Sequence, residues 1–313
     1  MDTTPKASGT QKGQNIQNLT EDEAREYIER LRWPSGPACP HCGSVNVYRM
    51  TGKSVRKGLL ACRDCDGHFT VTVGTVMADS HLPLATWVRA FHLIASSKRG
   101  MSALQLQRNL GLGSYRTAWH LAHRIREALK CEPVAGLLQG SVQCDEMYVG
   151  GKPRRGTGKH KRGRGTSKVP VVALVETGGN ARSAPVDRVN SATLRAALQE
   201  NVHPSARIVT DELGSYPSAA AGFAGHEHVK HSAGQYVNEC GLHTNTVESY
   251  FALFKRGVYG TFHHVSKKHL RRYCDEFSFR WNGRKVSDRE RCENAIRGID
   301  HKSLPYRGLV GGT

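Results

Sequence analysis

The sequence of 313 residues contains no apolar run near the roughly 18 residues that a membrane-spanning helix needs. Its first segment, MDTTPKASGTQKGQNIQ, also lacks the apolar stretch of a secretion signal. We therefore expect a cytoplasmic protein with no membrane partner. Residues 1–19 are polar and poor in apolar side chains, which predicts a disordered tail.

Acidic residues are scarce. The chain has 27 Asp and Glu against 45 Lys and Arg, so its formal net charge is +18. Such an excess is typical of proteins that bind a polyanion, most simply nucleic acid. The alternative is a solvated basic surface, but the positive charge is clustered along the chain.

The nine cysteines are an odd number in a chain without a visible signal, which favours reduced thiols over disulfides. Four of them form two C-x2-C pairs, CPHC at 39–42 and CRDC at 62–65. This spacing predicts that Cys39, Cys42, Cys62 and Cys65 bind one structural Zn²⁺. The zinc ribbon is a scaffold or a DNA contact; the cations that permit the second role are Arg49, Lys53, Arg56, Lys57 and Arg63.

A short helix over 21–33 precedes the ribbon, with Thr20 and Glu23 as a capping box, so residues 20–75 are taken as one unit. Residues 76–135 follow as a helical segment. Within it, 100–130 reads as a helix, a turn at 111–113 and a second helix that begins at Ser114.

The second helix has a predicted buried stripe formed by Ala118, Leu121, Ala122, Ile125 and Leu129. Its other faces carry Arg116, His120, His123, Arg124 and Arg126. This is typical of a helix-turn-helix whose second helix enters a major groove, with Arg116 and Arg124 contacting DNA. An ordinary helical hairpin is the alternative.

Residues 136–290 differ from the preceding segment in their pattern of side chains. Segments rich in β-branched residues predict strands in 141–151, 169–176, 181–189 and 206–213, with a weaker one in 226–232. A helix over 191–202 separates the third strand from the fourth, and two helices follow from about residue 245. The order indicates an α/β fold in which helices flank a mixed sheet. Residues 291–313 are left as a C-terminal tail.

Residues 151–168, GKPRRGTGKHKRGRGTSK, separate the first two strands and contain eight Lys or Arg and five Gly. Such a segment can follow a phosphate backbone, each cation releasing counterions; a solvated loop is the alternative. The cations predicted to contact DNA are Lys152, Arg154, Arg155, Lys159, Lys161, Arg162 and Arg164.

Three acids stand at the ends of regular elements: Asp145 in the first strand, Asp211 at the end of the fourth, and Glu248 at the start of a helix. Two Mg²⁺ ions held by such carboxylates suit phosphodiester chemistry, although spacing alone does not establish the site. Glu146 should point to the opposite face of the strand from Asp145. For Glu248, a capping pair with Asn245 is a purely structural alternative.

The chain resembles bacterial insertion-sequence transposases of the ISXO-like, Merlin-related group. These join an N-terminal zinc ribbon to a DDE domain with the ribonuclease H-like fold. The resemblance covers about residues 20–290 and is carried by CPHCGS, CRDC, CDEMYVGGK, VTDELGSY and the block HTNTVESYFALFKRGVYGTFHHVSKKHLRRYCDEFSFRWN.

The resemblance implies strand cleavage and strand transfer of double-stranded DNA at element ends, in a bacterial, nucleoid-associated protein. It implies two Mg²⁺ (or Mn²⁺) ions on Asp145, Asp211 and Glu248, and Lys255 as a basic residue of the site. Parts of the group have Asn as the third motif residue, which leaves Asn245 as the alternative to Glu248. Joining two ends implies a homodimer or a larger complex. The rival interpretations are a non-catalytic DNA-binding regulator derived from a transposase and a structure-specific nuclease.

Overall fold

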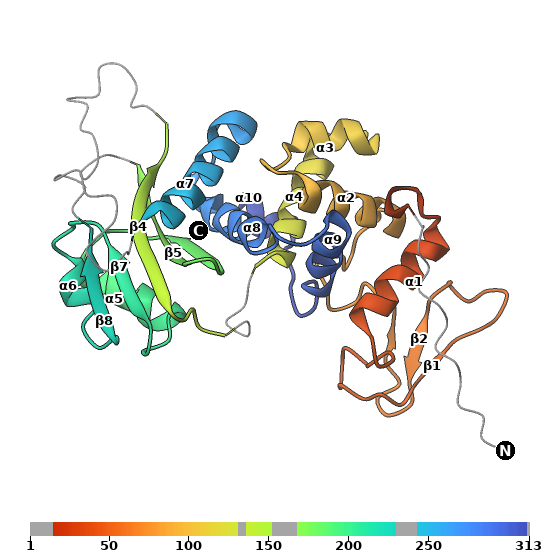
Figure 1. Ribbon diagram of the computed structural model, residues 1–313. Helices are drawn as coiled ribbons and strands as arrows, with labels where there is room; N and C mark the ends of the chain where they lie inside the picture. The colour runs from red at the N-terminus through yellow and green to blue at the C-terminus, as the bar shows by residue number, and fades with distance from the viewer. Residues whose placement is uncertain (1–14, 131–135, 152–167, 230–242, 312–313) are drawn as a thin grey trace.

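The computed structural model describes residues 15–130, 136–151, 168–229 and 243–311 (Figure 1). The predicted cations at 152–164 lie outside these ranges. So do residues 1–14 of the predicted tail and residues 230–232 of the weak predicted strand. Within the described ranges no helix combines the length and the apolar character needed to cross a membrane.

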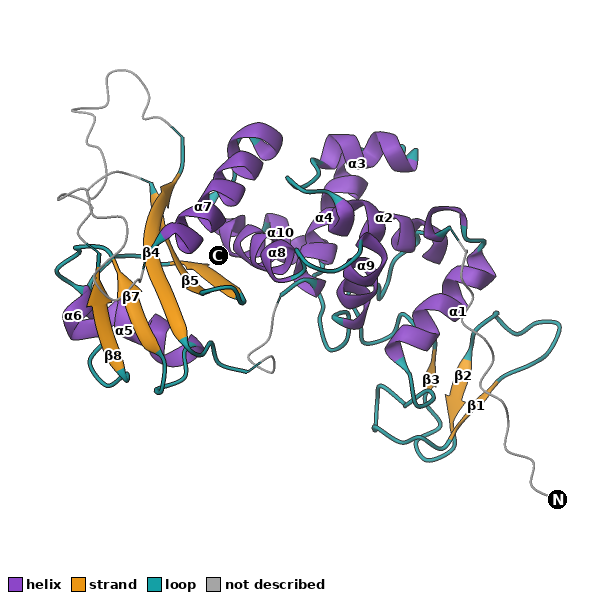
Figure 2. Cartoon of the chain, in the orientation of Figure 1, coloured by secondary structure: helices purple, strands orange, loops and turns teal. Residues whose placement is uncertain are grey.

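The N-terminal part is a three-stranded antiparallel sheet preceded by a helix (Figure 2). Its elements are α1 (Glu21–Arg32), β1 (Val47–Arg49), β2 (Leu60–Cys62) and β3 (His68–Phe69). The predicted capping box is confirmed, because the Glu23 backbone N–H donates to Thr20 Oγ1 and the Thr20 backbone N–H donates to the Glu23 carboxylate.

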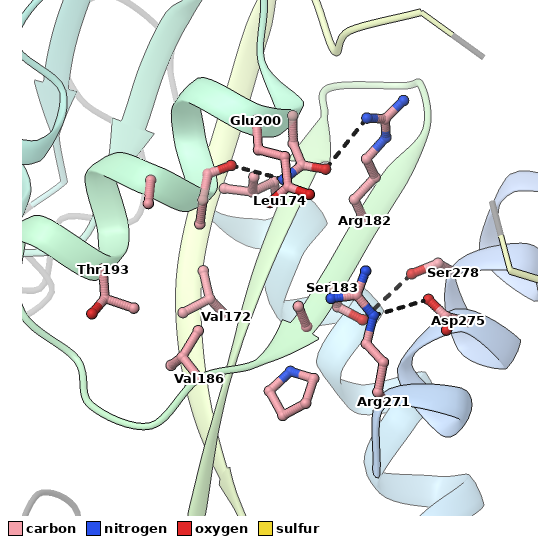
Figure 3. A pocket seen from close by; sticks show the side chains of 15 residues that line it. Val172, Leu174, Arg182, Ser183, Val186, Thr193, Glu200, Arg271, Asp275 and Ser278 are labelled. Carbon is pink, nitrogen blue, oxygen red and sulfur yellow. Dashed lines mark hydrogen bonds and ion pairs between the residues drawn. The ribbon is translucent and has the colours of Figure 1, made fainter. Parts of the chain in front are cut away.

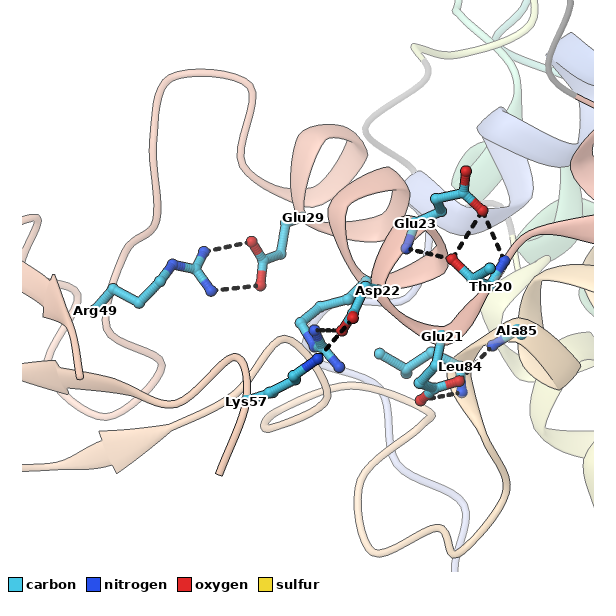
Figure 4. Close-up of polar contacts among 10 residues, drawn as sticks. Thr20, Glu21, Asp22, Glu23, Glu29, Arg49, Lys57, Leu84 and Ala85 are labelled. Carbon is cyan, nitrogen blue, oxygen red and sulfur yellow. Dashed lines mark hydrogen bonds and ion pairs between the residues drawn. The ribbon is translucent and has the colours of Figure 1, made fainter. Parts of the chain in front are cut away.

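Polar contacts tie the ribbon to α1 and to the next helix (Figure 4). Arg49 of β1 forms an ion pair with Glu29 at 2.6 Å, and Lys57 forms one with Asp22 at 2.9 Å. The Glu21 carboxylate accepts from the backbone N–H groups of Leu84 and Ala85 at the start of that helix. Two of the five cations considered for DNA contact are therefore engaged in ion pairs at the protein surface.

A helical core follows, made of α2 (Leu84–Ser96), α3 (Ala103–Leu110), α4 (Tyr115–Ala128), α9 (Asp288–Arg297) and α10 (Tyr306–Val310). The predicted turn is confirmed, with Gly111 in the left-handed region at φ 65°. The whole predicted stripe of α4 is buried. The C-terminal segment is structured: Cys292, Ala295 and Ile296 of α9 lie in one hydrophobic cluster with α1 and α2. The boundary predicted at residue 290 cuts through α9.

The faces of α4 depart from the expectation. His123, Arg124 and Arg126 were predicted to be exposed, yet they are 1%, 8% and 2% exposed. Arg124 donates to the Ala78 carbonyl, and its guanidinium lies 5.2 Å from the ring centre of Trp87. Contacts from α2 and α8 surround α4, so more than one stripe of this helix is inside the protein.

The second sheet of the chain has five strands in the order β6-β5-β4-β7-β8 and is mixed. The strands are β4 (Ser141–Val149), β5 (Val169–Glu176), β6 (Ala181–Pro185), β7 (Arg207–Thr210) and β8 (Gly225–His228). The first three in sequence pair antiparallel, while β7 and β8 add in parallel beside β4. This is the ribonuclease H-like arrangement, and it confirms the predicted fold class.

Helices cover both faces of the sheet. The helices are α5 (Ser191–Asn201) and α6 (Tyr216–Ala219) on one face, and α7 (Asn245–Gly257) and α8 (Leu270–Asn282) on the other. A π-helical turn (Val258–Phe262) and a 3-10 turn (Lys267–His269) connect α7 with α8. Figure 1 shows α7 and α8 between the sheet and the helical core.

Candidate active site

Asp145 and Asp211 lie side by side at one edge of the sheet. β4 and β7 are parallel neighbours, and Cys144 pairs with Thr210 in their register. Asp145 and Asp211 are the next residue along the chain in each case, directly beyond this last pair, so they begin from neighbouring positions at the sheet edge. β7 ends at Thr210, which places Asp211 where the chain leaves the sheet.

Strand alternation aims Asp145 toward α7. Met147 and Val149, which have the same parity as Asp145, pack in the cluster that contains α7 and α8. Glu146 points the other way, since Tyr216 of α6 donates its hydroxyl to Glu146 Oε2 at 3.0 Å. The predicted opposition of the two acids is thus confirmed.

Glu248 is in the first turn of α7, which packs against β4 and β5. The N-cap of α7 is Thr244, so Asn245 is the first helical residue. Thr244 Oγ1 donates to Glu248 Oε1 at 3.4 Å, and the Glu248 backbone N–H donates to the Thr244 carbonyl. The capping pair between Asn245 and Glu248 is therefore wrong.

The start of α7 is capped by a residue that sequence reasoning missed. Gln143 of β4 is 1% exposed, and its Oε1 accepts from the backbone N–H groups of both Thr246 and Val247 at 3.0 Å. Its Nε2 donates to Thr246 Oγ1 at 3.1 Å. Gln143 shares a strand face with Asp145, so one strand both carries that acid and fixes the helix that carries Glu248. A polar residue two positions before Asp145 in an otherwise β-rich run was the available signal.

The electrostatics of Asp145 show how crowded the acids are. The pKa of Asp145 is raised to about 7. Burial is the largest cause, the backbone N–H of Glu146, which donates to Asp145 Oδ1, opposes it, and the charges of Glu146, Asp211 and Glu248 add to the rise. Three carboxylates from separate elements therefore act on one another. A bound cation relieves such repulsion, because it replaces a proton as the compensating charge.

The donor chemistry suits a hard divalent ion, since carboxylate oxygens are the ligands that Mg²⁺ prefers. The three acids do not bring their oxygens within 4.8 Å of one another: among the described residues only the cysteine set meets that spacing. Asp211 Oδ1 is also engaged, accepting from the Leu213 backbone N–H at 3.1 Å. The acids thus match Mg²⁺ by donor type, while their oxygens are spaced more widely than in a closed metal site.

Lys255 stands seven residues after Glu248 on α7, and both side chains are exposed. Seven residues rise about 10 Å and fall about 20° short of two full turns, so both lie on one side of the helix. This geometry places a cation along the helix from the acids.

Two hollows border this sheet. One, of about 210 Å³, is lined by Asp211, Glu212, Leu213, His226 and His228, at the ends of β7 and β8. The other, of about 240 Å³, lies between β6, α5 and α8 (Figure 3). In it Arg271 pairs with Asp275 at 3.4 Å, and burial raises the pKa of Asp275 to about 6. Only the first hollow adjoins a predicted catalytic residue.

The four predicted zinc ligands come together as a separate centre. Their sulfur atoms all lie within 4.8 Å of one another, with Cys39 to Cys65 at 3.7 Å and Cys42 to Cys62 at 3.6 Å. Sulfurs on a tetrahedral Zn²⁺ with bonds of about 2.3 Å are about 3.8 Å apart, whereas a disulfide needs about 2.05 Å. The cluster therefore fits a structural zinc ion.

Of the two cations predicted on α4, only Arg116 is exposed. Its guanidinium lies 5.6 Å from the ring centre of Tyr306, and His120 Nε2 is 2.9 Å from the Leu304 carbonyl, so the C-terminal segment covers the adjoining face of α4. The prediction that Arg124 contacts DNA is wrong, because its buried guanidinium donates to the Ala78 carbonyl and lies against Trp87.

Comparison with known proteins gives a match for each of the two parts that contain these sites. The ISXO2-like transposase domain matches residues 137–282, and the transposase zinc-ribbon domain matches residues 19–68. An uncharacterized protein in transposable element ISH50 of Halobacterium salinarum is 30% identical over 275 residues, which are 84% of this chain and 91% of that protein. That source is archaeal, so it gives no support to a bacterial origin. No solved structure gives a significant match. The chain belongs to the ISXO2-like transposase family, with a zinc ribbon and a DDE domain.

Proposed function

We propose that this transposase cleaves DNA at the ends of its element and transfers the freed 3′-hydroxyl ends to target DNA, using Mg²⁺ (or Mn²⁺) held by Asp145, Asp211 and Glu248. The observation that carries the proposal is the convergence of these three acids at one sheet edge, with Asp145 buried among like charges. Without a cation that arrangement is unfavourable, so it is a poor device for stability alone.

Each residue has a defined part. Two divalent ions, when bound, supply activation of the attacking oxygen and stabilisation of the leaving oxygen. Asp145 is acted on by the charges of both other acids and must be ionised to act as a ligand. Gln143 holds the start of α7 on β4, which sets the separation of Glu248 from Asp145. Lys255 contacts a phosphate of the strand being processed.

DNA recognition belongs to the N-terminal parts in this proposal. The zinc ribbon and the exposed start of α4, with Arg116, contact the element ends. The cations at 152–164 add sequence-independent contacts with the backbone. Two ends must be joined together, so the working complex contains at least two copies of the chain.

Conservative substitutions test the acids. Glu248→Gln removes the charge and keeps a polar side chain at an exposed helical position. We expect it to fold normally and to lose Mg²⁺-dependent nicking and strand transfer by at least roughly a hundredfold, about 3 kcal/mol of transition-state stabilisation. Glu200→Gln, an exposed acid of α5 on the opposite face of the sheet, is the matched control.

The substrate is DNA that carries the sequences flanking the coding region, which we expect to contain short inverted repeats. Retained strand transfer in Glu248→Gln removes Glu248 from the mechanism and turns attention to Asn245. Binding without nicking by the wild-type protein supports the regulator instead. Cleavage of branched DNA without joined products supports a nuclease.

A further inference from the structure

A basic pocket of about 370 Å³ lies where the end of α2 meets α7, α8 and α9. Six of its ten lining residues are cations, and none is Asp or Glu. The six are Lys98, Arg99, Arg256, Arg280, Arg284 and Arg291. A cavity lined by one sign of charge concentrates the opposite charge inside it.

Three of these cations are already compensated. Arg280 is paired with Glu276 and donates to the Ser97 carbonyl, Arg291 is paired with Asp288, and Arg284 donates to the carbonyls of residues 178, 179 and 281. The other three, Lys98, Arg99 and Arg256, are exposed and have no ion pair with any described residue. Their charge is available to a ligand.

Two arginines of the wall add positive charge without offering their Nε groups to a ligand. Arg280 is 6% exposed, and its Nε and that of Arg291 are buried without a hydrogen-bond partner among the described residues. Because these N–H groups are inaccessible, an anion in the pocket would be held by Lys98, Arg99 and Arg256.

The walls of the pocket are closely packed. A Cβ on Gly257, at the end of α7, would lie 2.0 Å from the Phe277 ring and 2.9 Å from the Arg99 carbonyl oxygen. A Cβ on Gly100 would lie 2.5 Å from the Phe262 ring. The segment that carries Lys98 and Arg99 is thus pressed against α7 and α8, which holds the cations close to Arg256.

We infer that this pocket binds a backbone phosphate of the DNA that the acids process, an inference that rests on the proposed function. Arg256 is eight residues beyond Glu248 on α7, a rise of about 12 Å. Along a duplex with a rise of 3.4 Å per base pair, this is roughly three to four nucleotides from the scissile bond. The pocket takes phosphate without reading sequence.

The test compares two double variants that remove equal charge. Arg99→Ala with Arg256→Ala alters the pocket. Arg188→Ala with Arg207→Ala removes two exposed arginines from the loop before α5 and from the start of β7. Binding of a 30-base-pair duplex of arbitrary sequence is measured by fluorescence anisotropy from 50 to 200 mM NaCl without Mg²⁺, after equal thermal stability has been verified.

The binding constant K falls as the salt concentration rises, and each lost phosphate contact makes the slope of log K against log salt less steep by about 0.9. We expect the slope of the pocket variant to be smaller than that of the control by at least this amount. Equal slopes overturn the pocket and leave the proposed function standing. No binding by the wild-type protein overturns both. Ethylation of single phosphates shows which phosphate the pocket contacts. We expect ethylation three to four nucleotides from the cleaved bond to weaken binding by the wild-type protein and to have no effect on binding by the pocket variant. If the two proteins differ at another phosphate instead, the proposed placement is wrong.

Discussion

Replacing Asp145 by Asn should stabilise the metal-free protein while abolishing strand transfer. The pKa of Asp145 is raised from 3.8 to about 7, so the folded state binds a proton more tightly than the unfolded state does. Stability from this group is complete below pH 3.8 and is lost as the pH rises to 7. At about 1.4 kcal/mol for each pKa unit, the loss is up to about 4 kcal/mol at pH 8. Asn carries no charge and avoids this loss.

The assay is urea unfolding at pH 5, 6, 7 and 8 in buffers freed of Mg²⁺ without a chelator, which would also strip zinc. The advantage of Asp145→Asn should increase with pH up to 7 and then level off. Saturating Mg²⁺ should raise the stability of the wild type and leave that of the variant unchanged. Asp187→Asn, at a 90% exposed side chain, is the control and should show no such trend. A variant that is no more stable than wild type at pH 8 refutes the crowding of the acids.

Three further predictions concern other parts of the molecule. Gln143→Met leaves the two backbone N–H groups at the start of α7 without an acceptor, so the free energy of unfolding in urea should fall by roughly 2–4 kcal/mol. Gln143→Glu keeps an acceptor oxygen and should lose less of this free energy. Cys62→Ser should open the ribbon to limited proteolysis between residues 39 and 69 and leave the α/β sheet protected. Burial, and then neighbouring cations, lower the pKa of His123 to about 2. The contribution of this group to stability should therefore fall by about 2 kcal/mol from pH 7 to 5, as the unfolded histidine gains a proton, and His123→Phe should reduce the slope of stability against pH by that amount.

Local elements were predictable where residues close together in the sequence determine the structure. The two C-x2-C pairs gave the zinc ligands, because metal geometry fixes the spacing of the cysteines. Segments rich in β-branched residues predicted β4, β5 and β7, and the weaker prediction at 226–232 overlaps β8 at residues 226–228. The reciprocal pair Thr20 and Glu23 gave the start of α1.

The environment of α4 was not predictable because its partners are distant in sequence. Arg126 pairs with Glu276 at 2.6 Å, a residue 150 positions away, and Arg124 bonds to the Ala78 carbonyl. Charged side chains were assigned to solvent, as is usual for helices. The helical character of α9 was missed for a related reason: its apolar residues are few, and contacts with α1, α2 and α4 complete their burial.

The assembly of the acids was only partly predictable. The sequence placed Asp145 and Asp211 on strands, but the parallel pairing of β4 with β7 is what sets them side by side. The cap of α7 came from Gln143 of β4, more than a hundred residues before the helix. A local capping rule therefore selected Asn245, which has no part in the cap.

The helical core and the DDE sheet are joined by a buried ion network, and this bears on how DNA is held. Glu276 of α8 is 0% exposed and lies between Arg126 of α4 and Arg280. Although burial opposes its charge, the two arginines hold the pKa of Glu276 below its ordinary value. Breaking such a network by removing one partner leaves an uncompensated buried charge and costs about 3–5 kcal/mol.

This cost makes independent movement of the two parts unfavourable. Arg280 belongs both to that network and to the basic pocket, whose free cations come from the end of α2 and from α7. A phosphate bound there would contact the helical core and the helix of Glu248 together. DNA positioned by the N-terminal parts would then reach the acids in a fixed register, without a hinge between recognition and chemistry.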